Sequence, residues 1–97
     1  MKTILRWGRS AYERDADLAL ETSLLDAMGV SVIREPSRDV PSEWLPVADA
    51  LVVTSGVRVT HDVLARLRGS YLLTTTSGYD HIDMEAAREL GVSVAAP

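Results

Sequence analysis

Residues 50–78, ALVVTSGVRVTHDVLARLRGSYLLTTTSG, alternate between apolar runs and a helical segment, and this alternation decides the fold class. Residues 50–53 are a continuous apolar run, which is typical of a parallel strand that is covered on both faces. Thr60 then stands where a helix N-cap is expected, and the helix that follows ends at Gly69. Its buried side is predicted to consist of Val63, Leu64 and Leu67. Since residues 71–75 form the next strand-like run, the stretch predicts a parallel β-α-β unit.

The rest of the chain continues this alternation, with three more strand-like runs and two more helical segments. The strand-like runs are residues 3–7, 30–35 and 92–95. The first helical segment extends from about residue 13 to residue 28, and its apolar residues recur at every fourth position. They are Ala16, Leu20, Leu24 and Met28. The second helical segment follows a suitable N-cap, Asp80 or Asp83, and runs to Leu90.

Glycines and prolines mark the boundaries between these segments. Gly29 and Gly91 follow the predicted helices, where glycine adopts a positive φ angle without steric cost. Pro36, Pro41 and Pro46 leave room between them for only one helical turn, around residues 42–45.

Five strands that alternate with helices predict an α/β fold with a flavodoxin-like, doubly wound parallel sheet of five strands. The fifth strand is the last predicted element, so we expect a chain that is truncated before its last covering helix. An uncovered sheet face would leave an exposed apolar patch, and such a patch promotes self-association.

Length and composition exclude several classes of function. The 97 residues suffice for one small domain, and the net charge of −4 with scattered basic residues argues against a nucleic-acid partner. No apolar run approaches the ~20 residues that span a bilayer, so no membrane partner is expected. The absence of cysteine excludes disulfides and thiolate metal sites, and it favours a cytoplasmic location. His61 and His81 have no partner at metal-ligand or catalytic-triad spacing, so no metal site is predicted.

Hydroxyl groups and glycines gather at the predicted carboxyl ends of three strands. These ends are residues 7–10, 54–56 and 74–78. Ligands of open α/β sheets bind beyond such ends, and free N–H groups in glycine-containing turns favour an anion. The pattern therefore indicates a site for a small carboxylate or phosphate. The open alternative is that glycine, serine and threonine serve here only as turn residues.

Known ligand signatures of this fold are not matched. Residues 8–12 are a poor phosphate loop for a flavodoxin, and Trp7, Gly8 and Thr54 stand where a response-regulator receiver needs acidic residues. The sequence also contains no G-x-G-x-x-G dinucleotide fingerprint and no P-loop. The pattern thus predicts an anion site without a recognisable catalytic group.

Residues 77–87, SGYDHIDMEAA, resemble a stretch of the D-isomer-specific 2-hydroxyacid dehydrogenases. The substrate-binding domain of that family carries G-x-D-N/H-I/L-D-hydrophobic-x-A-A, followed by G-I/V-x-V and a proline, which residues 91–94 and Pro97 match. Residues 48–55, ADALVVTS, are similar to the preceding strand of the family. From Asp49 onward the resemblance is specific in its residues and their spacing. Before Asp49 it rests only on the order of the elements.

The resemblance implies that this chain binds a substrate carboxylate. In the family, backbone N–H groups of the turn that matches Ser77 and Gly78 hold the carboxylate, and the strand end that matches Thr54 faces the same cleft. The substrate-binding residues implied here are Thr54, Ser55, Ser77, Gly78 and Tyr79, the last at the cleft wall. Many relatives carry an arginine at the position of Thr54 and some at Thr74, so a second charge on the substrate would lack its usual partner.

The resemblance also implies chemistry that lies outside this chain. The family exchanges hydride between NAD or NADP and a 2-keto or D-2-hydroxy acid, using an arginine, a histidine and an acidic residue in or near a separate Rossmann domain. None of these matches a residue here, and His81 occupies the Asn/His position of the turn instead. Residues 1–97 would then be an incomplete substrate-binding domain with no catalytic and no cofactor-binding residue, inactive and without bound cofactor by itself.

The parent protein implied by the resemblance is a homo-oligomer, expected to be a dimer. Two alternatives stay open. The chain could be a non-catalytic, corepressor-like interaction module of the same fold, or a truncated product with no function of its own.

Overall fold

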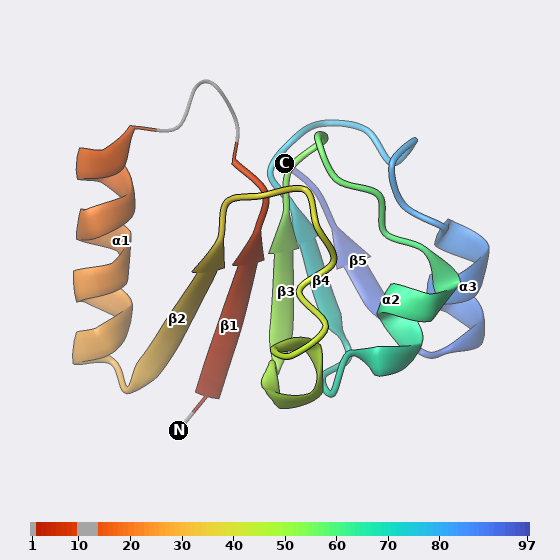
Figure 1. Ribbon diagram of the computed structural model, residues 1–97, viewed down its shortest axis with the longest axis horizontal. Helices are drawn as coiled ribbons and strands as arrows, with labels where there is room; N and C mark the ends of the chain where they lie inside the picture. The colour runs from red at the N-terminus through yellow and green to blue at the C-terminus, as the bar shows by residue number, and fades with distance from the viewer. Residues whose placement is uncertain (1, 10–13) are drawn as a thin grey trace.

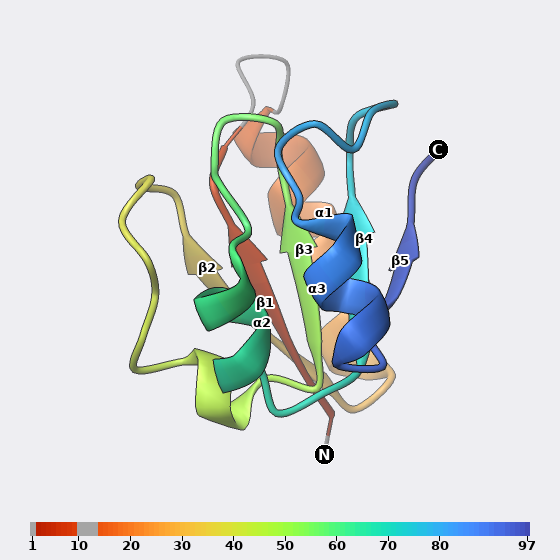
Figure 2. The ribbon, with the colours of Figure 1, turned by 90° about the vertical axis from the view of Figure 1, so that its right-hand side faces the viewer.

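The computed structural model describes residues 2–9 and 14–97, which form one parallel sheet with helices on both faces (Figures 1 and 2). The elements are β1 (Lys2–Trp7), α1 (Asp15–Ala27), β2 (Val30–Glu35), the 3-10 helix η1 (Leu45–Val47), β3 (Ala50–Val53), α2 (His61–Arg66), β4 (Tyr71–Thr74), α3 (Met84–Glu89) and β5 (Ser93–Ala95). The strand order is β2-β1-β3-β4-β5, with every neighbouring pair parallel. This order confirms the predicted flavodoxin-like sheet.

The register of the strands places one apolar row on the face that α2 and α3 cover. This row consists of Ile33, Leu5, Leu51, Leu72 and Val94, each paired with the next. Leu5, Leu51 and Leu72 are buried, and they form a core with Val63 and Leu64 of α2 and with Ala86 and Ala87 of α3. The hydrophobic core therefore lies on one side of the sheet.

The opposite face of the sheet is only partly covered by the described residues. Its central row consists of Arg34, Arg6, Val52, Leu73 and Ala95, and α1 packs against the β2 end of this row. Tyr71 and Leu73 of β4 are 65% and 44% exposed on this face. The expectation that residues 50–53 are covered on both faces is wrong for this structure, because Val52 is only half-buried. The expected apolar patch is present, whereas self-association through it stays a prediction.

Helix α1 has its predicted position but is rotated away from its predicted orientation. Leu20, Leu24 and Met28 are 60%, 58% and 75% exposed, so the predicted apolar stripe does not face the sheet. The reason is the polarity of the sheet beneath the helix. Arg34 donates hydrogen bonds to the carbonyl of Leu18 and the hydroxyl of Thr22, and Arg6 lies 3.7 Å from Glu21. These partners bring the side of α1 that carries Leu18, its buried residue, against the strands.

The predicted helix ends are largely confirmed. Thr60 accepts a hydrogen bond from the backbone N–H of Val63, and Asp83, rather than Asp80, accepts one from Ala86 at 3.0 Å. Gly29 and Gly91 have φ angles of 78° and 72°. Helix α2 ends at Arg66, before Gly69. The predicted turn around residues 42–45 is present, because Trp44 and Leu45 both donate to the carbonyl of Pro41, and η1 continues it from Leu45.

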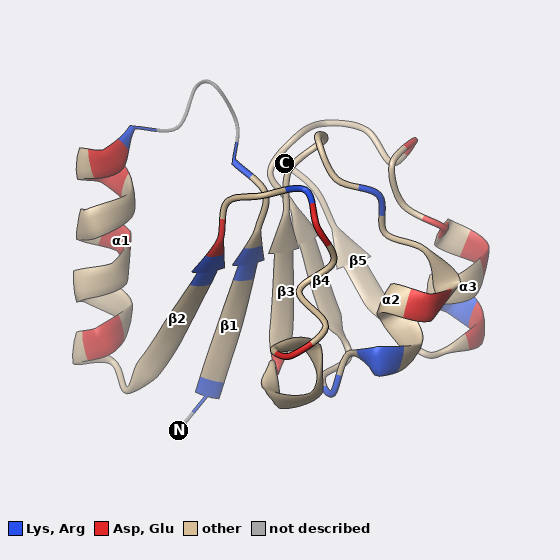
Figure 3. Cartoon of the chain, in the orientation of Figure 1, with Lys and Arg blue, Asp and Glu red and all other residues tan. Residues whose placement is uncertain are grey.

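Charged residues of both signs are distributed over the helices, strands and loops of the described chain (Figure 3). None of the helices in the described ranges combines the length and apolar character needed to cross a bilayer.

Candidate functional site

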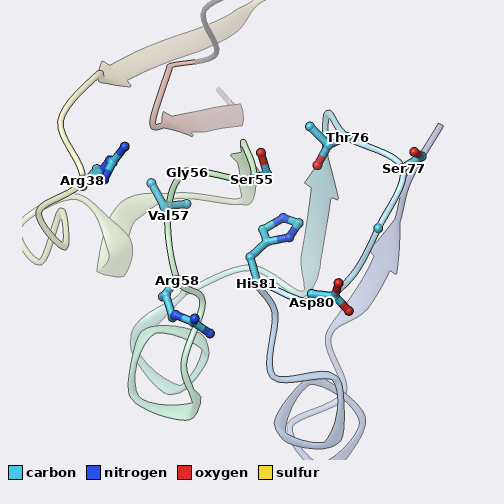
Figure 4. A pocket seen from close by; sticks show the side chains of 10 residues that line it. Arg38, Ser55, Gly56, Val57, Arg58, Thr76, Ser77, Asp80 and His81 are labelled. Atoms are coloured by element: carbon cyan, nitrogen blue, oxygen red, sulfur yellow. The ribbon is translucent and has the colours of Figure 1, made fainter.

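A pocket of about 630 Å³ lies at the carboxyl ends of β3 and β4. Residues 55–58 after β3 and residues 76–81 after β4 form most of its lining, and Arg38 reaches it from the segment after β2. The complete lining is Arg38, Ser55, Gly56, Val57, Arg58, Thr76, Ser77, Gly78, Asp80 and His81 (Figure 4). This edge of the sheet is where doubly wound folds bind ligands.

Backbone hydrogen bonds hold the two loops of the pocket together. Val59 donates to the carbonyl of His81 at 2.9 Å, and Asp83 donates to the carbonyl of Val59 at 2.9 Å, which forms an isolated parallel bridge between Val59 and Ile82. Thr75 donates to the carbonyl of Val53 at 2.9 Å and continues the pairing of β3 and β4. The two loops are therefore hydrogen-bonded to each other and, through Thr75, to the end of β3.

His81 is anchored in the pocket by a buried threonine. Its Nε2 lies 2.9 Å from Oγ1 of Thr74, a fully buried residue whose Oγ1 also lies 3.2 Å from Oγ1 of Thr76. Burial lowers the pKa of His81 below its ordinary value, and the negative charge of Asp80 opposes this shift. His81 is therefore a neutral hydrogen-bonding group at neutral pH.

The lowered pKa of His81 predicts a loss of stability in acid. Between the folded-state pKa and the unfolded value of about 6.5, the unfolded chain binds more protons, so the free energy of unfolding falls as the pH drops below about 6.5. His81→Gln, which keeps a hydrogen-bonding group but cannot titrate, is expected to reduce this slope. Urea unfolding of both proteins between pH 5 and pH 7.5 measures the difference, because all other titrating groups are common to the two. Identical pH slopes would contradict the role of His81.

The structure brings together three of the five predicted substrate-binding residues. Ser55, Ser77 and Gly78 line the pocket. Thr54 is only 3% exposed and lies behind the lining, and its Oγ1 has no hydrogen-bond partner in the described ranges. Tyr79 is exposed but is not among the lining residues. The binding roles of all five residues stay predictions.

The third predicted strand end, residues 7–10, does not join this pocket. Gly8 and Arg9 border a separate cavity of about 120 Å³ beside α1, and Ser10 lies outside the described residues. Gly8 nevertheless has a structural role at the strand end. Its φ angle is 86°, and an added Cβ would lie 2.7 Å from Oγ1 of Thr54.

Sequence reasoning missed Arg38, Arg58 and His81 as pocket residues. Arg58 follows β3 in the same loop as Ser55, so its place on the strand-end edge was a usable signal. Arg38 gave no such signal, because it lies in the proline-rich segment whose path depends on tertiary contacts. Among residues 2–9 and 14–97, no set of three histidine or acidic side chains is arranged to hold a metal ion.

Comparison with known proteins agrees with this architecture. Residues 13–96 match the family model of the D-isomer specific 2-hydroxyacid dehydrogenase catalytic domain. The chain is 35% identical over 82 residues to an erythronate-4-phosphate dehydrogenase of Teredinibacter turnerae, covering 84% of this chain and 22% of that protein.

Solved structures show the same fold at lower sequence identity. A cofactor (NAD+)-bound 3-phosphoglycerate dehydrogenase from Entamoeba histolytica superposes with a TM-score of 0.83 at 16% identity, over 99% of this chain and 33% of that chain. An NAD-dependent formate dehydrogenase from Staphylococcus aureus in complex with NAD gives 0.78 at 22% identity, over 97% of this chain and 30% of that chain. The chain thus spans about a fifth to a third of the length of these proteins. Since the family model covers most of the residues, the chain belongs to the D-isomer specific 2-hydroxyacid dehydrogenases, within their catalytic domain.

Proposed function

We propose that this chain is the substrate-binding part of an NAD(P)-dependent oxidoreductase that interconverts 2-keto acids and D-2-hydroxy acids. Membership of the dehydrogenase family supports the reaction class. The pocket at the carboxyl edge of the sheet supports a small acid as the ligand. Residues 1–97 would supply substrate binding, while the parent protein, a cytoplasmic homodimer, supplies the rest of the active site.

The observation that carries this proposal is the free backbone of the Ser77-Gly78 turn. Both residues line the pocket, and no hydrogen bond within the described chain occupies their N–H groups. A Cβ added at Gly78 would meet nothing within 4 Å, so the space beside the turn is open. Two adjacent N–H donors in an open turn suit a carboxylate, because each charge-assisted hydrogen bond offsets part of its desolvation.

The neighbouring side chains would orient the acid rather than react with it. Ser55 offers a hydroxyl to the pocket, and the neutral ring of His81 lines it while its Nε2 is engaged by Thr74. NAD or NADP would supply the hydride in the parent protein. The residues of this pocket do not fit the nucleotide, because the sequence has no G-x-G-x-x-G turn to receive its pyrophosphate. We therefore place proton and hydride transfer outside this chain, which is inactive by itself.

A corepressor-like interaction module is the second candidate function. The exposed Tyr71 and Leu73 on the sheet face favour it, since an apolar patch is a common feature of protein interfaces. Ligand binding separates the two functions. The dehydrogenase proposal requires a small acid in the pocket, whereas the interaction module requires none.

Removing one donor from the turn is expected to weaken acid binding. Gly78→Pro deletes the N–H, and the loss of one hydrogen bond to a carboxylate corresponds to about a 10-fold to 100-fold weaker affinity. Gly78→Ala keeps the N–H in open space and serves as the matched control. NMR titrations of the full-length protein with glyoxylate, pyruvate and hydroxypyruvate measure the affinity of each variant through changes in amide chemical shift. Shifts at Ser55, Ser77 and Gly78 in the wild type support the carboxylate site when those at Ser55 and Ser77, whose amides remain in both variants, are lost in Gly78→Pro and kept in Gly78→Ala. No shifts in the wild type at high millimolar ligand would refute it.

A further inference from the structure

Thr74 places a hydroxyl group inside the protein at the end of β4. The residue is fully buried, and it pairs with Val53 in the parallel ladder of β3 and β4. Burial of a hydroxyl costs free energy unless the group forms hydrogen bonds, and Thr74 has such partners. Because threonine is β-branched and this one belongs to a regular strand, its Oγ1 has a fixed position relative to the sheet. The side chain of Thr74 is therefore a rigid point next to the pocket.

The partners of this hydroxyl lie at the two ends of one loop, residues 76–81. At the start of the loop, Oγ1 of Thr76 lies 3.2 Å from Oγ1 of Thr74, and the N–H of Thr76 donates to the same atom at 3.5 Å. At its end, Nε2 of His81 lies 2.9 Å from that atom. A hydroxyl has one proton to donate and two lone pairs that accept, so it can serve all three groups. In Figure 4, the hydroxyl of Thr76 points toward the ring of His81, while Ser77 lies farther out along the loop.

The middle of the loop has no comparable support. Ser77 and Gly78 form no hydrogen bond within the described residues, and a Cβ at position 78 would have no neighbour within 4 Å. Glycine also has more backbone conformations open to it than any other residue. The N–H of Val59 donates to the carbonyl of His81 at 2.9 Å, which fixes the backbone at the end of the loop. The conformation of the two middle residues therefore depends on how the ends of the loop are held.

We propose that the hydroxyl of Thr74 positions the acid-binding turn by holding both ends of the loop that carries Ser77 and Gly78. The inference rests on the proposed carboxylate site and adds to it a residue that touches no ligand. A turn that is ordered before the acid arrives loses little backbone freedom on binding, so its two N–H groups bind more tightly than those of a mobile loop. Thr74 is thus a positioning residue, and it acts through Thr76 and His81.

Thr74→Val tests this role, because valine keeps the branched shape of threonine and lacks the hydroxyl. Thr75→Val is the matched control. It removes the next hydroxyl along the chain, whose Oγ1 is also buried but has no hydrogen-bond partner in the described residues. The N–H of Thr75, which donates to the carbonyl of Val53, remains in that variant. Thr74→Ser keeps the hydroxyl and tests rescue, and circular dichroism checks that each variant is folded.

NMR relaxation of the full-length protein measures the order of the turn directly. The amides of Ser77 and Gly78 are expected to have order parameters near about 0.85 in the wild type and below about 0.6 in Thr74→Val. The ¹⁵N signal of Nε2 of His81 should move in the same variant, because that nitrogen loses its partner. A general loss of stability would not produce this signature.

Titration of the same proteins with pyruvate measures the consequence for binding. Thr74→Val is expected to bind about 10-fold more weakly than the wild type, because the acid must then order the turn itself. Thr74→Ser should recover most of the affinity. Thr75→Val should stay within about 2-fold of the wild type.

Three results would overturn the inference. Low order parameters at Ser77 and Gly78 in the wild type would show that nothing holds the turn, and this measurement does not require any variant to fold. An ordered turn with unchanged affinity in Thr74→Val would show that the hydroxyl is not what holds it. An equal effect of Thr75→Val would show that the loss is not specific to position 74.

The measurements also separate this inference from the function on which it rests. A wild type that binds neither glyoxylate, pyruvate nor hydroxypyruvate, but whose turn becomes mobile in Thr74→Val, would overturn the carboxylate site and support the hold of Thr74 on the loop. A wild type that binds the acid at Ser77 and Gly78, with equal affinity in Thr74→Val, would overturn the role of Thr74 and leave the carboxylate site intact.

Discussion

Gly69→Ala is expected to prevent stable folding of this chain. A Cβ at position 69 would lie 1.7 Å from the carbonyl oxygen of Asp49 and 2.3 Å from its carbonyl carbon. These are backbone atoms, so no side-chain rotation relieves the overlap. Gly69 also donates to the carbonyl of Ala48 at 2.9 Å, and this hydrogen bond fixes the close approach. We expect the free energy of unfolding to fall by at least about 4 kcal/mol, which is a large part of the ~5–15 kcal/mol of a typical domain.

Gly78→Ala provides the matched control for this substitution. The same atom added at position 78 would have no neighbour within 4 Å, and the change should alter the free energy of unfolding by less than about 0.5 kcal/mol. Circular dichroism and urea unfolding of the two variants make the comparison. A Gly69→Ala protein with the thermal midpoint of the wild type would show that the connection between α2 and β4 does not lie against Asp49.

Leu72→Ala is expected to have the second largest effect. Leu72 is 2% exposed at the centre of the core row, between Leu51 and Val94 of the adjacent strands. Truncation of a buried leucine removes its transfer free energy and leaves a cavity, which together cost about 2–5 kcal/mol. A small domain with its core on one side of the sheet has few other contacts to offset this loss.

Leu73→Ala on the same strand is the control, because Leu73 is 44% exposed on the opposite face. Its replacement should cost less than about 1 kcal/mol. Denaturant unfolding measures the free energy of unfolding of both variants. An unchanged m-value, the slope of that free energy against denaturant concentration, checks that the two values are comparable. A larger loss for Leu73→Ala than for Leu72→Ala would mean that the face with α1 is the principal core, contrary to the register of the sheet.

The local pattern of the sequence predicted most of the fold. Alternating runs identified all five strands, and capping chemistry identified Thr60 at the start of α2. These features depend on residues a few positions apart, so the sequence contains the necessary information. The choice between Asp80 and Asp83 as the cap of α3 needed the structure, because both are suitable acceptors and only the path of the turn selects Asp83.

Part of the candidate site could also be predicted from the sequence. Ser55, Ser77 and Gly78 follow neighbouring strands, and parallel strands bring their carboxyl ends to one edge. Arg38 entered the pocket through the packing of an irregular segment, which no periodic pattern describes. Thr54 likewise lies buried behind the lining, where its Oγ1 would be 2.7 Å from a Cβ at position 8, a contact between two strand ends that no local pattern describes.

The sequence by itself determined the class of fold, the order of its elements and the family resemblance, because these reside in short-range periodicity and in one contiguous motif. Tertiary structure alone decided which face of α1 meets the sheet, since Arg6 and Arg34 on the strands needed polar partners that the apolar stripe does not offer. It also decided the role of Gly69, which the sequence suggested as a helix end. Gly69 is required because the backbone of Asp49, twenty residues away in the chain, occupies the space that any side chain would need.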